Sequence, residues 1–253
     1  GVDACLLFDP VNVRYATGSR NMQIFTSRNG PSRYLFVPLD GPVILFEFTG
    51  CEHLAANLET IDEIRPAMTA SFVAAGDEIA GRERLWARTM GDLIRQHCGS
   101  TATVGVERIN AGAAIALAGE GFTIVDAQQP VEMARAIKSD EELKCIVSSI
   151  RATERGVGQL RGAIGPGVTE QQLWSVLHQA IIAQGGDYIE TRLLSSGERT
   201  NPWFQETSER VIQPNEIIAL DTDVVGCFGY YADFSRTFHS GPDEPTAHQR
   251  ELY

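Results

Sequence analysis

Cysteine is scarce in this sequence, with five residues among 253 and no pair in a C-x-x-C spacing. The five are Cys5, Cys51, Cys98, Cys145 and Cys227. An odd number of widely separated cysteines excludes a zinc ribbon and argues against a disulfide framework. We therefore predict reduced thiols in a cytoplasmic protein.

Positive charge is also in short supply. Lys and Arg number 21 against 33 Asp and Glu, which gives a formal net charge of −12. Proteins that bind nucleic acid or anionic membranes need a basic face, so we expect neither kind of partner. No apolar run approaches the roughly 18–20 residues of a membrane span. The start, Gly1 to Phe8, lacks the basic region of a signal peptide, so none is expected.

What is present divides into two halves. The first, residues 1–127, alternates short strand patterns with helical ones, which indicates an α/β domain. The expected strands are 4–8, 34–38, 42–48, 103–106 and 122–126, and the clearest helix is 82–98. Asp40 and Gly41, between the second and third strands, predict a hairpin turn.

The second half, residues 128–253, opens with two helices. Ser139 with Glu142 and Thr169 with Gln172 are capping boxes, in which two side chains satisfy free backbone amides at a helix start. Strand patterns follow at 190–194, 217–225 and 230–238. Pro245, Thr246 and Gln249 indicate a third helix start so close to the final residue that we expect the chain to stop partway through its second domain.

Three aspartates, Asp221, Asp223 and Asp233, form the candidate site. Side chains two apart on a strand share a face, so Asp221 and Asp223 point the same way. Glycines at 226 and 229 can turn the chain back and bring Asp233 alongside them. Gathered carboxylates repel one another unless cations lie among them, and oxygen ligands suit divalent ions such as Mn, Fe, Co or Zn. Spacing alone also allows Asp221 to cap a turn and Asp223 to be solvated.

The segment 217–238 resembles the first metal-binding segment of the peptidase family M24, which includes Xaa-Pro aminopeptidases, prolidases and creatinase. That pattern is an apolar strand ending in Asp-x-Gly, a short connection, and Asp-(Ile/Phe)-(Thr/Ser)-Arg-Thr-Phe. Asp221 matches the first ligand, and the run from Asp233 to Phe238 matches the second with its flank. The run from Asp9 to Gly18 resembles an N-terminal motif of the creatinase-like domain.

The resemblance implies a fold and an assembly. It implies an α/β N-terminal creatinase-like domain over residues 1–127. An α+β pita-bread (M24) catalytic domain follows it, and residues 128–253 form the first half of that domain. A homodimer is expected. The remaining family ligands, one His and two Glu, are expected beyond Tyr253, and so is the catalytic base, so no catalytic residue is assigned.

Two departures from the peptidase pattern stand out. First, Asp223 replaces the family glycine, and a carboxylate on that face can be a further ligand. The gap between Asp221 and Asp233 is also one residue longer than in typical members, which predicts a β-bulge in the hairpin. Second, Trp203 lies in the segment where the peptidases carry an upstream His. Its ring can face an onium cation, and the alternative is that it is a core aromatic.

Both departures resemble the dimethylsulfoniopropionate lyases of this fold family. That resemblance implies that Asp221, Asp223 and Asp233 are ligands of two divalent metal ions, with iron as the expected metal, and that Trp203 binds substrate. The expected reaction cleaves this small molecule into dimethyl sulfide and acrylate. The alternatives are an Xaa-Pro aminopeptidase or prolidase-type metallohydrolase, a creatinase-like amidinohydrolase, and a metal-free scaffold of the same fold.

Overall fold

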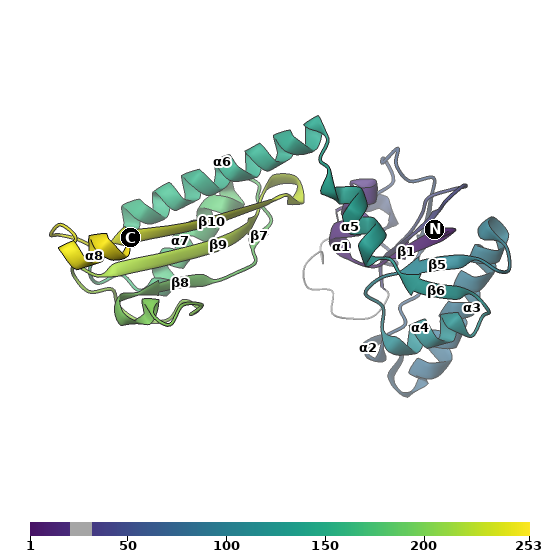
Figure 1. Cartoon of the computed structure of the whole chain (residues 1–253). Coiled ribbons are helices and arrows are strands. Elements are labelled where there is room, and N and C mark those ends of the chain that lie inside the picture. The colour runs from purple at the N-terminus through teal and green to yellow at the C-terminus, as the bar shows by residue number, and fades with distance from the viewer. Residues whose placement is uncertain (21–31) are drawn as a thin grey trace. The chain divides into compact units, whose positions relative to one another are not determined.

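The computed structural model describes residues 1–20 and 32–253. Within them the chain forms two compact units, Gly1–Ile137 and Lys138–Tyr253 (Figure 1). The division comes later than the expected boundary after residue 127 because helix α5 (Gln128–Ala136) belongs to the first unit. Val131 packs against apolar residues of that unit, and the Arg135 guanidinium donates a hydrogen bond to the Asn12 side chain.

The first unit is built on a six-stranded sheet in the order β4-β3-β2-β1-β5-β6. Its strands are β1 (Ala4–Leu7), β2 (Tyr34–Pro38), β3 (Ile44–Glu47), β4 (Glu63–Pro66), β5 (Thr103–Val106) and β6 (Thr123–Asp126). The sheet is mixed, since β1 pairs antiparallel with β2 and parallel with β5. The other helices are α1 (Pro10–Thr17), α2 (Phe72–Ala75), α3 (Ile79–Cys98) and α4 (Ala111–Ala118), with 3-10 turns η1 (Glu52–Leu54) and η2 (Gly76–Glu78). The expected α/β fold is confirmed.

Both faces of this sheet are buried. Leu6 and Phe36 contribute to one apolar cluster, while Leu7 and Leu35 contribute to another. Adjacent residues of a strand point to opposite faces, so the continuous apolar runs of β1 and β2 fill two layers of core. Each fully buried side chain of this kind contributes about 1.5–3 kcal/mol.

Tyr34 is the largest polar side chain of this core. It is 0% exposed and stacks on Phe46 with ring centroids 4.7 Å apart, and the edge of Trp86 meets it at 6.2 Å. Its hydroxyl accepts a hydrogen bond of 3.3 Å from the Met68 backbone amide. Burial is the main cause that raises the pKa of Tyr34 to about 12.

Tyr34→Phe should reduce the fall in the free energy of unfolding that occurs as pH rises above about 10. The unfolded chain ionises near pH 10 and the folded chain near 12, so the stability that comes from neutral Tyr34 is full below about pH 10 and lost as pH rises toward 12. The difference amounts to up to roughly 2–3 kcal/mol. Urea unfolding across this range measures it. Tyr253→Phe, which alters a side chain 88% exposed, is the control, and parallel curves for wild type and Tyr34→Phe would contradict the assignment.

The second unit places two helices against a four-stranded antiparallel sheet (Figure 1). The helices are α6 (Asp140–Ala163) and α7 (Glu170–Ala183), with α8 (Ala247–Leu252) near the final residue. The strands are β7 (Tyr188–Ile189), β8 (Leu193–Ser196), β9 (Ile217–Val225) and β10 (Tyr231–His239), with 3-10 turns η3 (Gly197–Thr200) and η4 (Cys227–Gly229). Both predicted capping boxes are confirmed, and the third predicted helix start proves to be a capping box as well. In the described residues, no helix combines the length and apolar character that crossing a bilayer requires.

One predicted strand is wrong. Residues 190–194 do not form a continuous strand, because the chain breaks between β7 and β8 while both pair with β9. Ile189 lies opposite Val224, and Leu193 lies opposite Asp221. Three residues, 190–192, therefore face two, 222–223, which is the geometry of a β-bulge.

The alternation of β9 gives the sheet one covered face and one open face. Ile218, Leu220 and Val224 join the apolar cluster formed with α6 and α7. The alternate residues, among them Asp221 and Asp223, are only partly buried. Strand geometry therefore puts the acidic residues on the face opposite the two helices.

Candidate metal centre

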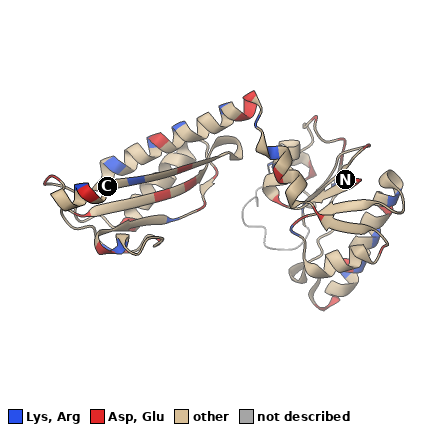
Figure 2. Cartoon of the chain, viewed as in Figure 1, with Lys and Arg blue, Asp and Glu red and all other residues tan. Residues whose placement is uncertain are grey.

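The hairpin of β9 and β10 brings the three predicted aspartates onto one face. Asp233 lies directly opposite Asp223, and Ser235 lies directly opposite Asp221. Directly paired residues of antiparallel strands have side chains on the same side, so Asp221, Asp223 and Asp233 share the open face. In Figure 2, red segments mark the middle of this strand pair.

The predicted bulge within this hairpin is wrong. Pairing continues without a break from Tyr231 opposite Val225 to His239 opposite Ile217. The additional residue is absorbed by the turn at 226–230, where Phe228 and Gly229 have positive φ of 65° and 82°. The bulge lies on the other side of β9, between β7 and β8, so it shifts residues 190–192 instead of Asp233.

Two hydroxyl groups hold the carboxylates of β9. The Thr191 hydroxyl, from the bulge, donates to Asp223 Oδ2 at 2.9 Å and accepts from the Asp223 amide at 3.1 Å. The Ser235 hydroxyl donates to Asp221 Oδ1 at 2.7 Å. Each hydrogen bond engages one oxygen of its carboxylate and fixes the orientation of that carboxylate. The other oxygen takes no part in the bond. Sequence reasoning missed both residues. The hairpin register would have revealed Ser235, but no sequence signal marked the bulge that places Thr191.

The electrostatics of this face favour a cation. Among the described residues, none of the three aspartates has an ion-pair partner. Desolvation first, and then the negative charges of Asp223 and Asp221, raise the pKa of Asp233. Carboxylates that destabilise one another in this way are stabilised when a divalent ion lies among them.

The donor set fits a divalent metal in its chemistry, since carboxylate oxygens suit hard and borderline ions. In residues 1–20 and 32–253, however, no group of three or more His, Cys, Asp or Glu side chains could hold a metal ion. Residues two apart on a strand are separated by roughly 6–7 Å, so Asp221 and Asp223 do not converge on one point by themselves. The three carboxylates thus form an acidic face, and they would need further groups to become a closed metal site.

Tyrosines continue this face at the turn end of the hairpin. Tyr231 precedes Asp233 by two positions on the same strand, and its hydroxyl lies 3.4 Å from that of Tyr188. Burial and contacts with Tyr188 and Glu190 raise the pKa of Tyr231, which keeps the phenol neutral. Tyr230 points elsewhere, because its hydroxyl donates to Glu142 Oε1 at 3.1 Å.

Trp203, the predicted substrate-binding residue, lies in the loop between η3 and β9. Its ring is half-buried, and its aromatic neighbour is Phe204, with centroids 6.2 Å apart. Phe204 itself is 74% exposed. No hydrogen bond or ring contact within the described residues joins Trp203 to the three aspartates. The structure therefore brings the aspartates together and leaves Trp203 on a separate loop.

A buried carboxylate anchors that loop. Glu170, in the first turn of α7, is 0% exposed and accepts hydrogen bonds from the backbone amides and hydroxyls of Ser196 and Ser208 at 2.7–2.9 Å. The Arg199 guanidinium donates to the same carboxylate. Both ends of the segment that carries Trp203 are thus tied to one side chain.

Family models match both units of the chain. Residues 1–137 match the creatinase/prolidase N-terminal domain, and residues 144–253 match metallopeptidase family M24. The first match corresponds to the unit Gly1–Ile137, and the second lies within the unit Lys138–Tyr253.

Two curated relatives are similar over nearly the whole chain. The dimethylsulfoniopropionate lyase DddP of Roseobacter denitrificans is 35% identical over 98% of this chain and 56% of its own length. The DddP of Roseovarius nubinhibens is 37% identical over 96% of this chain and 55% of its own length. The chain thus spans little more than half the length of these curated relatives.

Solved structures share the fold at lower identity. The Xaa-Pro dipeptidase from Bacillus anthracis superposes with a TM-score of 0.77 at 19% identity, covering 100% of this chain and 64% of that one. The prolidase from Pyrococcus furiosus gives 0.75 at 16% identity, covering 100% and 66%. These structures show the fold, and the matches to both family models show that the chain belongs to the M24 family, with a creatinase/prolidase N-terminal domain.

Proposed function

We propose that the protein containing this chain is a lyase that cleaves dimethylsulfoniopropionate into dimethyl sulfide and acrylate. The observation that carries the proposal is Asp223, a carboxylate directly opposite Asp233 where peptidases of the family have glycine. The similarity to two lyases of this name, at 35% and 37% identity, supports it. The prolidase and dipeptidase structures are 16–21% identical and support the fold alone.

Asp221, Asp223 and Asp233 would hold two divalent metal ions, with iron as the proposed metal. Such ions would supply Lewis-acid polarisation of the substrate carboxylate, which makes the adjacent C–H more acidic. The residues of the chain would contribute orientation. The Thr191 and Ser235 hydroxyls each occupy one oxygen of a ligand carboxylate, and such supporting contacts fix ligand geometry in metal sites.

Trp203 would recognise the sulfonium end of the substrate. An indole face attracts an onium cation by about 0.5–2 kcal/mol, and the attraction grows when water is excluded. The anchoring of its loop by Glu170 limits the positions that the ring can take. Loss of dimethyl sulfide as a neutral group needs no water nucleophile, so a peptidase scaffold can support elimination.

Headspace dimethyl sulfide from the full-length, metal-loaded protein tests this function. We expect release above the rate of a protein-free blank, together with one equivalent of acrylate. A proline dipeptide assayed in parallel tests the rival function, an Xaa-Pro aminopeptidase or prolidase. Hydrolysis of the dipeptide without dimethyl sulfide would replace the lyase proposal. A metal-free protein that is inactive in both assays would indicate a binding scaffold.

Thr191→Val should weaken metal binding by about 10–100-fold, because outer contacts of this kind orient the ligand carboxylate. Valine preserves the shape of the side chain but removes the hydroxyl that donates to Asp223 Oδ2. Metal retention against a graded series of chelator concentrations measures the effect. Thr191→Ser keeps the hydroxyl and is the matched control. Equal retention in the two variants would show that the bulge contact has no role in the site.

Two further assignments accompany the proposal. A homodimer is proposed from the resemblance to the family, and light scattering of the full-length protein tests it. A reducing, cytoplasmic setting is proposed because the five cysteines are all free thiols.

A further inference from the structure

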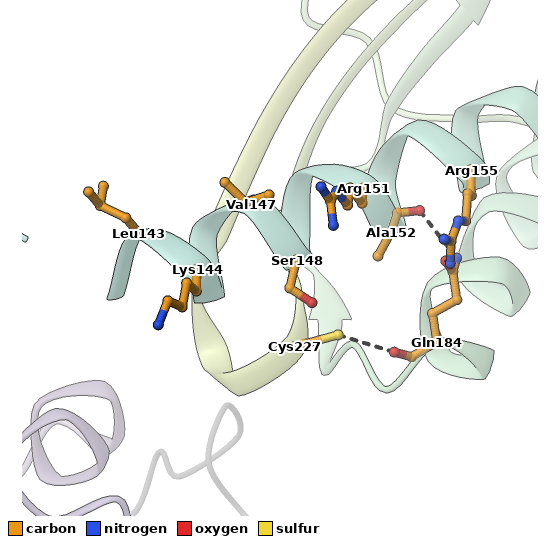
Figure 3. A pocket seen from close by; sticks show the side chains of 9 residues that line it. All are labelled: Leu143, Lys144, Val147, Ser148, Arg151, Ala152, Arg155, Gln184 and Cys227. Atoms are coloured by element: carbon orange, nitrogen blue, oxygen red, sulfur yellow. Dashed lines mark hydrogen bonds between the residues drawn. The ribbon is translucent and has the colours of Figure 1, made fainter. Parts of the chain in front are cut away.

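A cavity of about 540 Å³ lies on the helical side of the second unit, between α6, the end of α7 and the turn that joins β9 to β10 (Figure 3). Its volume lies within the roughly 300–1,000 Å³ typical of small-molecule sites. The lining contains three cationic side chains and no Asp or Glu. That sign is opposite to the formal net charge of the chain, −12.

The cations come from one face of α6. Lys144, Arg151 and Arg155 follow one another at intervals of seven and four residues, which places them along a single stripe of the helix (Figure 3). Arg151 has no hydrogen-bond or ion-pair partner among the described residues. Lys144 pairs with Glu141, but both side chains are at least 70% exposed, so this pair holds the ammonium weakly.

Hydrogen bonds hold the opposite wall, formed by Gln184 and Cys227, in place. The Gln184 side-chain amide donates to the carbonyls of Ala152 and Ala180 at 3.2 and 2.8 Å, and its oxygen accepts from Arg155 at 3.3 Å. The Cys227 thiol donates to the Gln184 carbonyl at 3.1 Å. These contacts tie the turn of the hairpin to the end of α7 and orient the Arg155 guanidinium toward the cavity wall.

Close packing fixes the turn against α6 as well. A side chain at Gly226 would lie 2.4 Å from the Ser149 hydroxyl, so the backbone approaches the helix more closely than any other residue would allow. A wall that is positioned before binding does not have to be ordered by the ligand, which favours affinity.

We propose that this cavity binds a small organic anion through its phosphoryl or carboxylate oxygens. Arg151 and Arg155, one helical turn apart, bind the anionic group, because guanidinium forks match such oxygens in charge and geometry. Lys144 contacts a second negative group two turns away along the helix. Leu143 and Val147, which are 49% and 43% exposed, pack against an apolar portion of the ligand.

Alkylation of Cys227 by iodoacetamide, a neutral reagent, locates the binding in the full-length protein. Inorganic pyrophosphate and succinate are the probes, at constant ionic strength, and the pair distinguishes phosphoryl from carboxylate recognition. At least one probe should slow the alkylation of Cys227, while Cys5, Cys51 and Cys98 react at unchanged rates. Peptide mass spectrometry measures the extent of modification at each cysteine. Calorimetry on the same samples gives the dissociation constant.

The variant Arg151→Ala/Arg155→Ala should weaken binding by roughly tenfold for each arginine removed and abolish the protection of Cys227. Arg88→Ala removes an exposed arginine from α3 and is the matched control, with affinity unchanged. Protection by neither probe, or equal protection in the double variant, would overturn the proposal. If the protein binds neither anion and the double variant changes its oligomeric state, the cationic stripe of α6 belongs to a protein interface. That result would also overturn the proposal.

Discussion

Asp223→Gly should lower dimethyl sulfide release by at least about 100-fold, since loss of outer contacts alone lowers metal affinity or activity 10–100-fold. The substitution restores the residue that peptidases of the family carry at this position. It removes the carboxylate opposite Asp233 and leaves the Thr191 hydroxyl without its acceptor. The number of metal ions per protein chain should fall in parallel, which elemental analysis of the purified protein measures.

The companion variants separate chemistry from folding. Glycine inside a strand costs roughly 0.5–1 kcal/mol of stability, so Asp223→Gly also weakens the fold. Asp223→Asn preserves the shape of the side chain and removes only its charge. If the carboxylate is what matters, Asp223→Asn must lower activity by a comparable factor. Asp40→Asn changes an exposed aspartate of the first unit and should leave activity unchanged. If Asp223→Gly keeps full lyase activity and metal content, Asp223 is not a ligand. If it gains hydrolysis of a proline dipeptide, this position separates the two activities.

Glu170→Ala should destabilise the second unit by about 3–5 kcal/mol, because it removes the acceptor of several hydrogen-bond donors and the charge partner of Arg199, which is 24% exposed. The carboxylate is 0% exposed and receives hydrogen bonds from Ser196, Ser208 and Arg199. Its loss leaves buried amides without acceptors and frees both ends of the Trp203 loop. Urea unfolding, with hydrogen exchange read on α7 and β8, measures the change for this unit alone.

The matched control for Glu170 is a second acidic residue of the same region. Glu206 pairs with Arg192, but the two side chains are 68% and 53% exposed. Glu206→Gln should therefore change stability by less than about 1 kcal/mol. Glu170→Gln, which keeps the size of the side chain, should fall between the two variants. Equal stabilities for Glu170→Ala and Glu206→Gln would show that the buried network has no structural role.

Local signals predicted much of this fold correctly. The three predicted helix starts are capping boxes in the structure because the cap and the residue that reciprocates it lie within one helical turn. Strands β1, β2 and β3 appeared as apolar runs because both of their faces are buried, whereas the more exposed β4 carried no apolar run and was not predicted. The face shared by Asp221 and Asp223 followed from the two-residue period of a strand.

The errors concern pairing between segments. The additional residue between Asp221 and Asp233 predicted a bulge in the hairpin, but the turn absorbs it at Phe228 and Gly229, where positive φ is available. The observed bulge lies between β7 and β8. It depends on the register with which these two short strands both pair with the long strand β9. No local pattern carries that information, because a bulge is defined by residues on both strands.

The sequence by itself determined the element types, the family and the three acidic positions, since propensity, capping and alternation act over a few neighbouring residues. Only the tertiary structure decided that Asp233 lies opposite Asp223, that Thr191 and Ser235 hold the carboxylates, and that Glu170 anchors the loop of Trp203. These contacts join residues ten or more positions apart, and their geometry depends on register and packing that form when the whole unit folds.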